Sequence, residues 1–162
     1  MIRGVHHVAV ATGDLDRLIT FYTELLGFEV GTRGGWKVGN DVADAIVGLP
    51  GSSCRAATLK AGNLFIEVFE YQTPQGRPGD PDRPVCDHGY THFALDVIDV
   101  DAEYERLSAA GMRFHCPPPP RSAVSRGSVR ATYGRDPDGN VIELQEVVDP
   151  DYPLQLDLPG RA

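Results

Sequence analysis

Apolar and polar positions follow two different periods along the chain, and the first stretch already shows both. Residues 4–11 alternate with the period of two that is typical of a strand. Residues 14–27 repeat leucine, isoleucine and tyrosine at helical spacing. Asp14 suits the N-cap of this helix, and Gly27 suits its C-terminal end. The pattern predicts a strand followed by one amphipathic helix.

The rest of the first half predicts more strands. Residues 28–32 are expected to form a short strand, and residues 34–53 a glycine-rich loop around a short helical segment. A hairpin is expected from residues 55–60 and 63–71. Residues 72–89 are rich in Pro, Gly and Asp, which do not sustain a strand ladder, and they predict a linker.

The second half repeats this order. Residues 90–97 read as a strand, and Asp99 and Gly111 mark the two ends of the next helix. Four prolines form a stiff connector at 117–120, before a final hairpin whose turn, Asp136-Pro137-Asp138-Gly139, has type I composition. The sequence therefore predicts an α+β fold of two tandem βαβββ modules, with a first module at 1–71, a linker at 72–89, a second module at 90–148 and an extended tail at 149–162.

Four polar residues occupy matching places in the two halves. Glu143 lies in the middle of the last strand, where a lone carboxylate normally faces solvent, but Glu67 holds the equivalent place in the first half. His7 and His92 are likewise equivalent on the first strand of each half. His6 competes with His7, but strand alternation predicts that His6 points to the opposite face. The repeat predicts one site shared by two histidines and two glutamates.

These four side chains suit a divalent metal of intermediate hardness. The set has no thiolate, which disfavours a structural zinc cage, and its nitrogen donors disfavour Ca²⁺ or a bare Mg²⁺ site. One metal ion per site is expected, and Zn²⁺, Ni²⁺, Fe²⁺, Mn²⁺ and Co²⁺ all fit the donors.

Composition limits the kinds of partner. The chain has 162 residues, of which 41% are hydrophobic, so it can bury a sizeable core. Its net charge of −8 argues against binding nucleic acid or an anionic membrane and leaves small-molecule or protein partners. The sequence shows neither a membrane span nor a signal peptide, so a cytoplasmic location is expected. The cysteines, Cys54, Cys86 and Cys116, are expected to be free thiols.

The chain resembles the vicinal oxygen chelate superfamily, which includes glyoxalase I, methylmalonyl-CoA epimerase, extradiol dioxygenases, fosfomycin-resistance enzymes and bleomycin-binding proteins. The resemblance covers residues 4–148. It is carried by the segments Val-His-His-Val-Ala-Val, Leu-Ile-Thr-Phe-Tyr-Thr-Glu-Leu-Leu-Gly-Phe, Phe-Ile-Glu-Val-Phe-Glu-Tyr, Thr-His-Phe-Ala-Leu-Asp-Val and Asp-Pro-Asp-Gly-Asn-Val-Ile-Glu-Leu.

The resemblance implies a fold and a reaction class. In that superfamily two βαβββ modules pair edge to edge into a curved, mostly antiparallel sheet that encloses a metal, and the ligands would be His7, Glu67, His92 and Glu143. A full ligand set resembles the glyoxalase and epimerase branch. The expected activity is a metal-dependent lyase or isomerase reaction on a small oxygen-chelating substrate through an enediolate-like intermediate. Glu143 is the first choice for the catalytic base and Glu67 the second.

Two alternative functions remain open. An Fe(II)-dependent dioxygenase of the same fold would use two histidines and one carboxylate, and a non-catalytic drug-binding or resistance protein would need no full ligand set. Glyoxalase I proteins typically carry an arginine for glutathione four residues after the first metal histidine, where this chain has Ala11, which argues against glutathione. A substrate pocket is expected from Trp36, Arg55, Phe65, Phe69 and Tyr133.

The resemblance also predicts a symmetric homodimer, because superfamily members either exchange modules between subunits or pack paired modules back to back, and because the leucine-rich tail needs a surface to cover. Sedimentation velocity at micromolar concentration should give twice the chain mass of 17.6 kDa. A single species with the mass of one chain would contradict this prediction.

Overall fold

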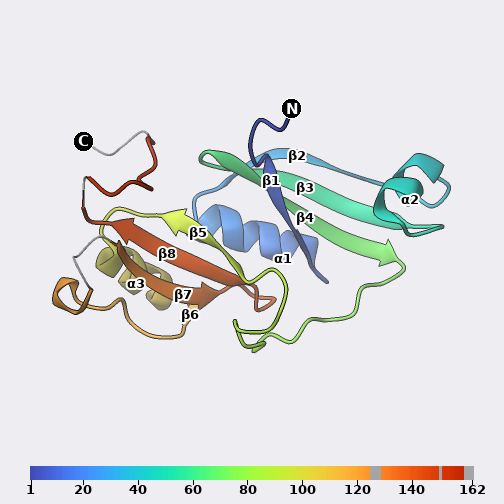
Figure 1. Ribbon diagram of the computed structural model, residues 1–162. Helices are drawn as coiled ribbons and strands as arrows, with labels where there is room; N and C mark the ends of the chain where they lie inside the picture. Colours follow the sequence, from blue (N-terminus) through green and yellow to red (C-terminus); the bar gives the residue numbers. More distant parts are fainter. Residues whose placement is uncertain (125–128, 150, 159–162) are drawn as a thin grey trace. The chain divides into compact units, whose positions relative to one another are not determined.

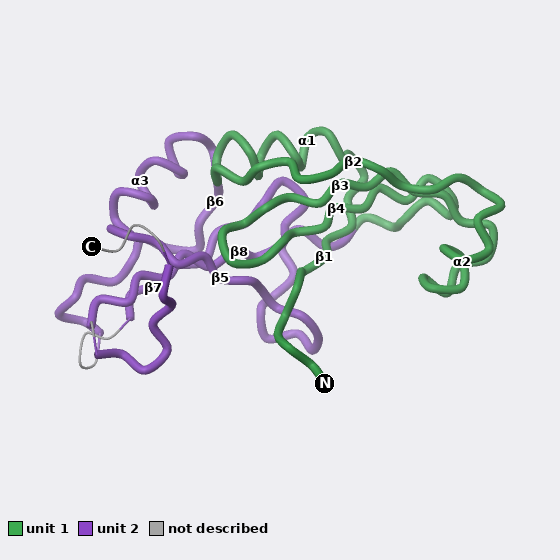
Figure 2. The backbone as a smooth tube through the Cα atoms, turned by 90° about the horizontal axis from the view of Figure 1, so that it is seen from above, with its two compact units in different colours: residues 1–78 green, residues 79–162 purple. Residues whose placement is uncertain are grey.

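A computed structural model describes residues 1–124, 129–149 and 151–158. The chain forms two compact units, residues 1–78 and residues 79–162, and their boundary falls inside the 72–89 segment (Figure 2). Each unit contains one four-stranded sheet and is described by itself. In the described part of the chain, no helix has both the length and the apolar character needed to cross a membrane.

Unit 1 contains one βαβββ module with a short extra helix. Its sheet has the order β1-β4-β3-β2, in which β1 runs parallel to β4 and the other pairs are antiparallel. Helix α1 contacts β3 and β4. The elements, shown in Figure 1, are β1 (His7–Ala11), α1 (Leu15–Thr20), the π-helical turn η1 (Phe21–Leu25), β2 (Glu29–Trp36), α2 (Asp41–Val47), β3 (Ser53–Ala61) and β4 (Leu64–Thr73).

The predicted first helix is present, and its last part is wider than an α-helix. Asp14 is the N-cap, and its carboxylate accepts a hydrogen bond from the backbone N–H of Arg17 at 3.0 Å. The hydroxyl of Thr23 donates to the Ile19 carbonyl at 2.9 Å. This bond competes with the main-chain ladder where the π-helical turn forms. Gly27, with φ of +72°, ends the helical stretch as predicted.

Strand β2 is longer than predicted, because the glycines that suggested a loop belong to the strand. Gly35 has φ of +134°, and a Cβ atom there would collide with the carbonyl of Cys54 on β3. The missing side chain thus lets β2 approach β3 closely, which is a known role of glycine in strands. The expected helical segment does form as α2, between Asn40 as N-cap and Gly48 with φ of +69°, and lies beyond the ends of β2 and β3 (Figure 1).

Unit 2 repeats the module. Its sheet has the order β5-β8-β7-β6, with β5 parallel to β8 and the other pairs antiparallel, so the α+β fold of tandem βαβββ modules is confirmed. Positions 125–128 of the predicted second module and positions 150 and 159–162 of the predicted tail lie outside the described residues. The elements are β5 (His92–Asp96), α3 (Val100–Ala109), β6 (Arg113–Phe114), the 3₁₀ turn η2 (Arg121–Ala123), β7 (Val129–Arg135) and β8 (Val141–Val147).

A buried arginine ties helix α3 to the sheet of unit 2. Arg130 on β7 is 6% exposed, and its two terminal nitrogens donate to the carboxylate of Asp101 at 2.7 and 2.8 Å. It also donates to Glu146, its register partner on β8, and to the carbonyl of Pro119. The hydrogen bond from Arg130 lowers the pKa of Asp101. A guanidinium with this many acceptors can be buried without an unmatched charge.

The turn between β7 and β8 forms as the sequence predicts. The N–H of Gly139 donates to the carbonyl of Asp136 at 3.0 Å, and the Asp136 carboxylate accepts from the N–H groups of Asp138 and Asn140. Gly139 has φ of +89°, and a Cβ atom there would lie 2.7 Å from the carbonyl oxygen of Pro81. The turn therefore packs against backbone from the 79–89 segment.

Replacing Gly139 by alanine should destabilise the protein more than the same change at Gly62, the equivalent glycine between β3 and β4. Both residues have positive φ, which costs about 1–2 kcal/mol for alanine. Gly62 has open space around its Cα atom, but Gly139 meets the backbone of Pro81, which adds about 1–3 kcal/mol of overpacking. The free energy of unfolding of both variants is measured by urea denaturation. Equal losses would show that the contact with Pro81 carries no cost.

Candidate metal centre

The first histidine and glutamate meet on neighbouring parallel strands of unit 1. The register places His7 opposite Phe65 and Ala9 opposite Glu67. The Nε2 atom of His7 lies 3.2 Å from Oε2 of Glu67, and the two side chains are 42% and 28% exposed. The alternate residues of β4, Ile66 and Val68, are buried in the core. Strand alternation thus sets Glu67 on the face of β4 opposite to the core.

The second histidine and glutamate repeat this arrangement in unit 2. His92 lies opposite Val141 and Ala94 opposite Glu143, the same offset as in unit 1. The Nε2 atom of His92 lies 2.9 Å from Oε2 of Glu143, and the side chains are 26% and 13% exposed. Each unit therefore presents one imidazole nitrogen and one carboxylate oxygen beside each other.

In each pair, the residue before the histidine lies within hydrogen-bond distance of Nδ1, the second ring nitrogen. Nδ1 of His6 lies 3.0 Å from Nδ1 of His7, and Oγ1 of Thr91 lies 2.9 Å from Nδ1 of His92. The prediction that His6 points to the opposite face was wrong. Strand β1 begins at His7, so alternation does not govern His6, whose ring stacks on Phe65 with centroids 5.0 Å apart.

An aromatic cluster lies in unit 1, where Trp36 of β2 meets two rings of β4, the strand that carries Glu67. Trp36 lies near Phe69 and Tyr71, with ring centroids 6.2 and 5.8 Å apart. The indole N–H of Trp36 donates to the hydroxyl of Ser52 at 2.8 Å, and Ser52 donates to Asp44 of α2 at 2.6 Å. The predicted pocket residues Phe65, Trp36 and Phe69 therefore share unit 1 with the first pair. Tyr71 was not among the predicted pocket residues, although it continues the alternation of Phe65, Glu67 and Phe69.

The lining beside the second pair is polar. Tyr133 lies opposite Glu143 in register, and its ring centroid is 4.8 Å from that of His92. Burial, and then the charge of Glu143, raise the pKa of Tyr133. His115 lies next to Tyr133, with centroids 6.1 Å apart, and its Nε2 accepts a hydrogen bond from Arg135 at 3.2 Å. His115 and Arg135 were not predicted, because His115 follows a two-residue strand without an alternation signal.

Arg55, a predicted pocket residue, lies elsewhere. Its guanidinium donates to Glu70 at 2.8 Å and to Asp16 of α1 at 2.6 Å, on the helix-covered face of the sheet. This is the unit 1 equivalent of the contacts that Arg130 makes in unit 2. Hydrogen bonds from Arg55, and then from Arg33, lower the pKa of Asp16. The structure thus brings Arg55 together with the helix and not with Glu67.

The two pairs fit the donors and spacing of a divalent metal site. Two ligand atoms that lie about 2.1 Å from one metal, at roughly a right angle, are about 3 Å apart, close to the 3.2 and 2.9 Å found here. In the described part of the chain, His, Cys, Asp and Glu side chains form no group of three or more that could hold a metal. Each unit by itself therefore supplies two of the four expected ligands.

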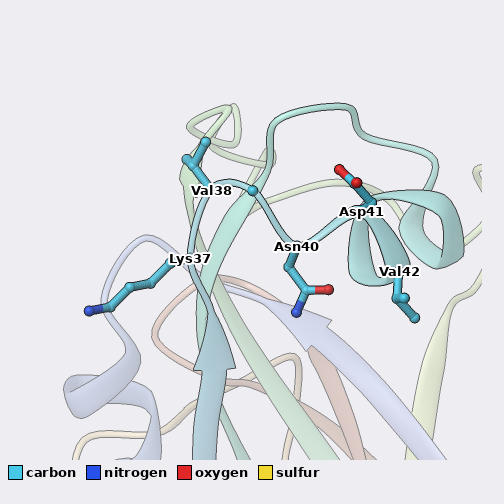
Figure 3. A pocket seen from close by; sticks show the side chains of 6 residues that line it. Lys37, Val38, Asn40, Asp41 and Val42 are labelled. Carbon is cyan, nitrogen blue, oxygen red and sulfur yellow. The ribbon is translucent and has the colours of Figure 1, made fainter.

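An open hollow in unit 1 has a different composition. It has a volume of about 580 Å³ at the start of α2 and is lined by Lys37, Val38, Gly39, Asn40, Asp41 and Val42. The labelled side chains point in different directions and do not converge on a common point (Figure 3). A small-molecule site usually combines enclosure with convergent polar groups. The hollow contains none of the predicted site residues.

The chain belongs to the family described as the Glyoxalase/Bleomycin resistance protein/Dioxygenase superfamily, whose model matches residues 4–144. This confirms the resemblance drawn from the sequence.

Relatives and solved structures agree with this assignment. The chain is 33% identical to a 2-epi-5-epi-valiolone epimerase from an Actinomyces species, over 86% of this chain and 77% of that protein. It is 28% identical to the glutathione transferase FosA of Serratia marcescens, over 89% of this chain and 81% of that protein. A glyoxalase family protein from Bacillus cereus shares the fold with a TM-score of 0.79 and 23% identity, over 92% and 97% of the two chains.

The burial of each cysteine predicts how fast its thiol reacts. No disulfide forms among the described cysteines, and Cys54 is 3% exposed whereas Cys86 and Cys116 are exposed. Burial raises the pKa of Cys54 to about 11. At pH 8 about one Cys54 in a thousand is then a thiolate, against roughly a quarter of ordinary thiols.

A disulfide reagent at pH 8 should therefore modify two thiols of the folded protein rapidly and the third only after denaturant is added. The absorbance of the released thiol measures both phases. Cys54→Ala should remove the slow thiol and keep the two fast ones. Three fast thiols in the folded parent would show that Cys54 is accessible.

Proposed function

We propose that the protein is a divalent-metal-dependent isomerase or lyase, with epimerisation of a small oxygen-chelating substrate as its best-supported reaction. The metal ligands of the proposal are His7, Glu67, His92 and Glu143. One observation carries it: each module places an imidazole Nε2 and a carboxylate oxygen about 3 Å apart at equivalent positions. Two such pairs make a four-ligand set of nitrogen and oxygen donors.

The relatives support this reaction class. The 33% identical relative is named an epimerase, and other relatives are named lactoylglutathione lyases. Ala11 supplies no cation for glutathione four residues after His7. The proposed substrate is accordingly a small molecule with two neighbouring oxygens, one of them a carbonyl, and not a glutathione adduct.

The proposed site residues have different roles in the reaction. When bound, a divalent metal supplies a Lewis acid that stabilises negative charge on a carbonyl oxygen and so acidifies the neighbouring carbon. Glu143 is the proposed base that removes the proton. It is less exposed than Glu67 and lies beside Tyr133. Glu67 mainly holds the metal and is the second candidate for the base. A proton from solvent, delivered to the opposite face of the carbon, completes an epimerisation, and Glu143 releases the proton it removed to solvent.

Metal reconstitution tests the proposal directly. The protein is stripped with chelator, reloaded separately with Zn²⁺, Ni²⁺, Co²⁺, Mn²⁺ or Fe²⁺, and incubated in D₂O with 2-epi-5-epi-valiolone, 2-oxoaldehyde thiol adducts, acyl-CoA thioesters and catechols. Metal-dependent deuterium incorporation at one substrate carbon, seen by proton NMR, is expected. Oxygen consumption with Fe²⁺ and a catechol would instead identify a dioxygenase, and substrate binding without exchange would identify a binding protein.

The two glutamates should respond differently to replacement by glutamine, which keeps the shape and an oxygen donor but removes the charge and the base. Glu143→Gln should retain much of the metal yet lose about 10²- to 10⁴-fold in turnover, the usual contribution of a positioned base. Glu67→Gln should mainly weaken metal binding, and excess metal should restore its turnover.

Metal content and turnover are measured for both variants and the parent. Arg106→Gln, which breaks an exposed pair with Glu103 on α3, is the matched surface control and should behave like the parent. Equal losses that excess metal restores in both glutamate variants would leave the carboxylates as ligands only. Full turnover in Glu143→Gln would exclude Glu143 as the base.

A further inference from the structure

The two candidate ligand histidines share a feature beyond their glutamates: both rings are bonded at both nitrogens. Nε2 of His7 faces Glu67, and its Nδ1 lies 3.0 Å from Nδ1 of His6. Nε2 of His92 faces Glu143, and its Nδ1 lies 2.9 Å from Oγ1 of Thr91. His6 and Thr91 have different chemistry but occupy the same place in the repeat, directly before the histidine.

The chemistry of imidazole explains why this position matters. A ring that offers the lone pair of Nε2 to a metal must carry its hydrogen on Nδ1, and that N–H needs an acceptor. Nδ1 of His6 can accept when the hydrogen of that ring is on Nε2, and the hydroxyl oxygen of Thr91 can always accept. Both contacts can therefore accept a hydrogen bond from the Nδ1–H of the tautomer that metal binding requires.

The same partners also suit the metal-free pairs. Without metal, an Nε2–H group can donate to the glutamate, and Nδ1 then needs a donor. A hydroxyl and a neutral imidazole can each serve as donor or acceptor, whereas a backbone carbonyl or a carboxylate can only accept. His6 and Thr91 thus allow each ligand ring to change tautomer without losing its second hydrogen bond.

The position of His6 is itself held by strand β4. Its carbonyl accepts a hydrogen bond from the N–H of Phe65 at 3.1 Å, and its ring stacks on the Phe65 ring at an interplanar angle of 29°. Because Phe65 lies two residues before Glu67, the same strand places both partners of the His7 ring. His6 is therefore kept beside His7 although it precedes β1.

We propose that His6 and Thr91 are positioning residues that hold the ring orientation of His7 and His92 and accept the Nδ1–H of the metal-binding tautomer, so that Nε2 of each is available to the metal. This inference rests on the metal site of the proposed function. Loss of such an outer partner typically weakens metal affinity by about 10- to 100-fold.

The test compares variants that remove the ring nitrogen or the hydroxyl and keep the shape. His6→Phe keeps a ring to stack on Phe65, and Thr91→Val keeps the branched side chain. Thr91→Ser restores the hydroxyl, and His88→Phe changes a histidine outside both pairs. Zn²⁺ alone is the probe, its affinity is measured by competition with a chromophoric chelator, and urea unfolding of each variant verifies that it is folded.

We expect Zn²⁺ affinity to fall about 10- to 100-fold in His6→Phe and in Thr91→Val, and to stay within about twofold of the parent in Thr91→Ser and His88→Phe. Long-range ¹H–¹⁵N spectra of the parent should show the hydrogens of His7 and His92 on Nδ1 once Zn²⁺ is bound. Unchanged affinity in both shape-conserving variants, or hydrogens on Nε2 in the Zn²⁺-bound parent, would overturn the inference.

These outcomes separate the inference from the proposed function. A parent protein that binds no Zn²⁺ or Ni²⁺ contradicts both. Tight binding that the variants leave unchanged contradicts only the role of His6 and Thr91. Weakened binding in the variants, together with oxygenase activity or no turnover in the parent, supports the inference and contradicts the proposed reaction.

Discussion

Parallel pairing of the first and last strands of each module is the interaction on which the candidate site depends. It sets Ala9 opposite Glu67 and Ala94 opposite Glu143, so that an imidazole at the start of one strand meets a carboxylate in the middle of the other. Parallel strands need a long crossover connection, which the helix and the two intervening strands provide. A shift of one residue in either register would turn the glutamate to the other face of the sheet.

A second set of charges holds each helix to its sheet. Arg130 pairs with Asp101 and Glu146 in unit 2, and Arg55 contacts the equivalent aspartate and glutamate in unit 1. Each module therefore uses its acidic residues on two faces: one glutamate beside a histidine, and a second, three positions later, beside an arginine.

The two modules are alike at the histidine–glutamate pairs but differ in the residues around these pairs. Aromatic rings of β2 and β4 gather in unit 1, whereas Tyr133 adjoins the pair of Glu143 in unit 2 and is itself in contact with His115, which accepts a hydrogen bond from Arg135. Equivalent carboxylates thus have unequal surroundings.

The elements that obey local rules could be predicted from the residues alone. Caps at Asp14 and Asp99, the turn ending at Gly139 and the doubled order of strands and helices follow from backbone chemistry and periodicity, and the repeat selected His7, Glu67, His92 and Glu143 as equivalents. The directions in which Arg55, His6 and His115 point depend on tertiary contacts and could not be predicted. Each lies where a long-range partner overrides the local pattern: the carboxylates of Glu70 and Asp16 hold Arg55, the ring of Phe65 holds His6, and Arg135 holds His115. Alternation fixes the face of a residue within a strand, but it cannot predict a contact made outside the strand or by an element far along the chain.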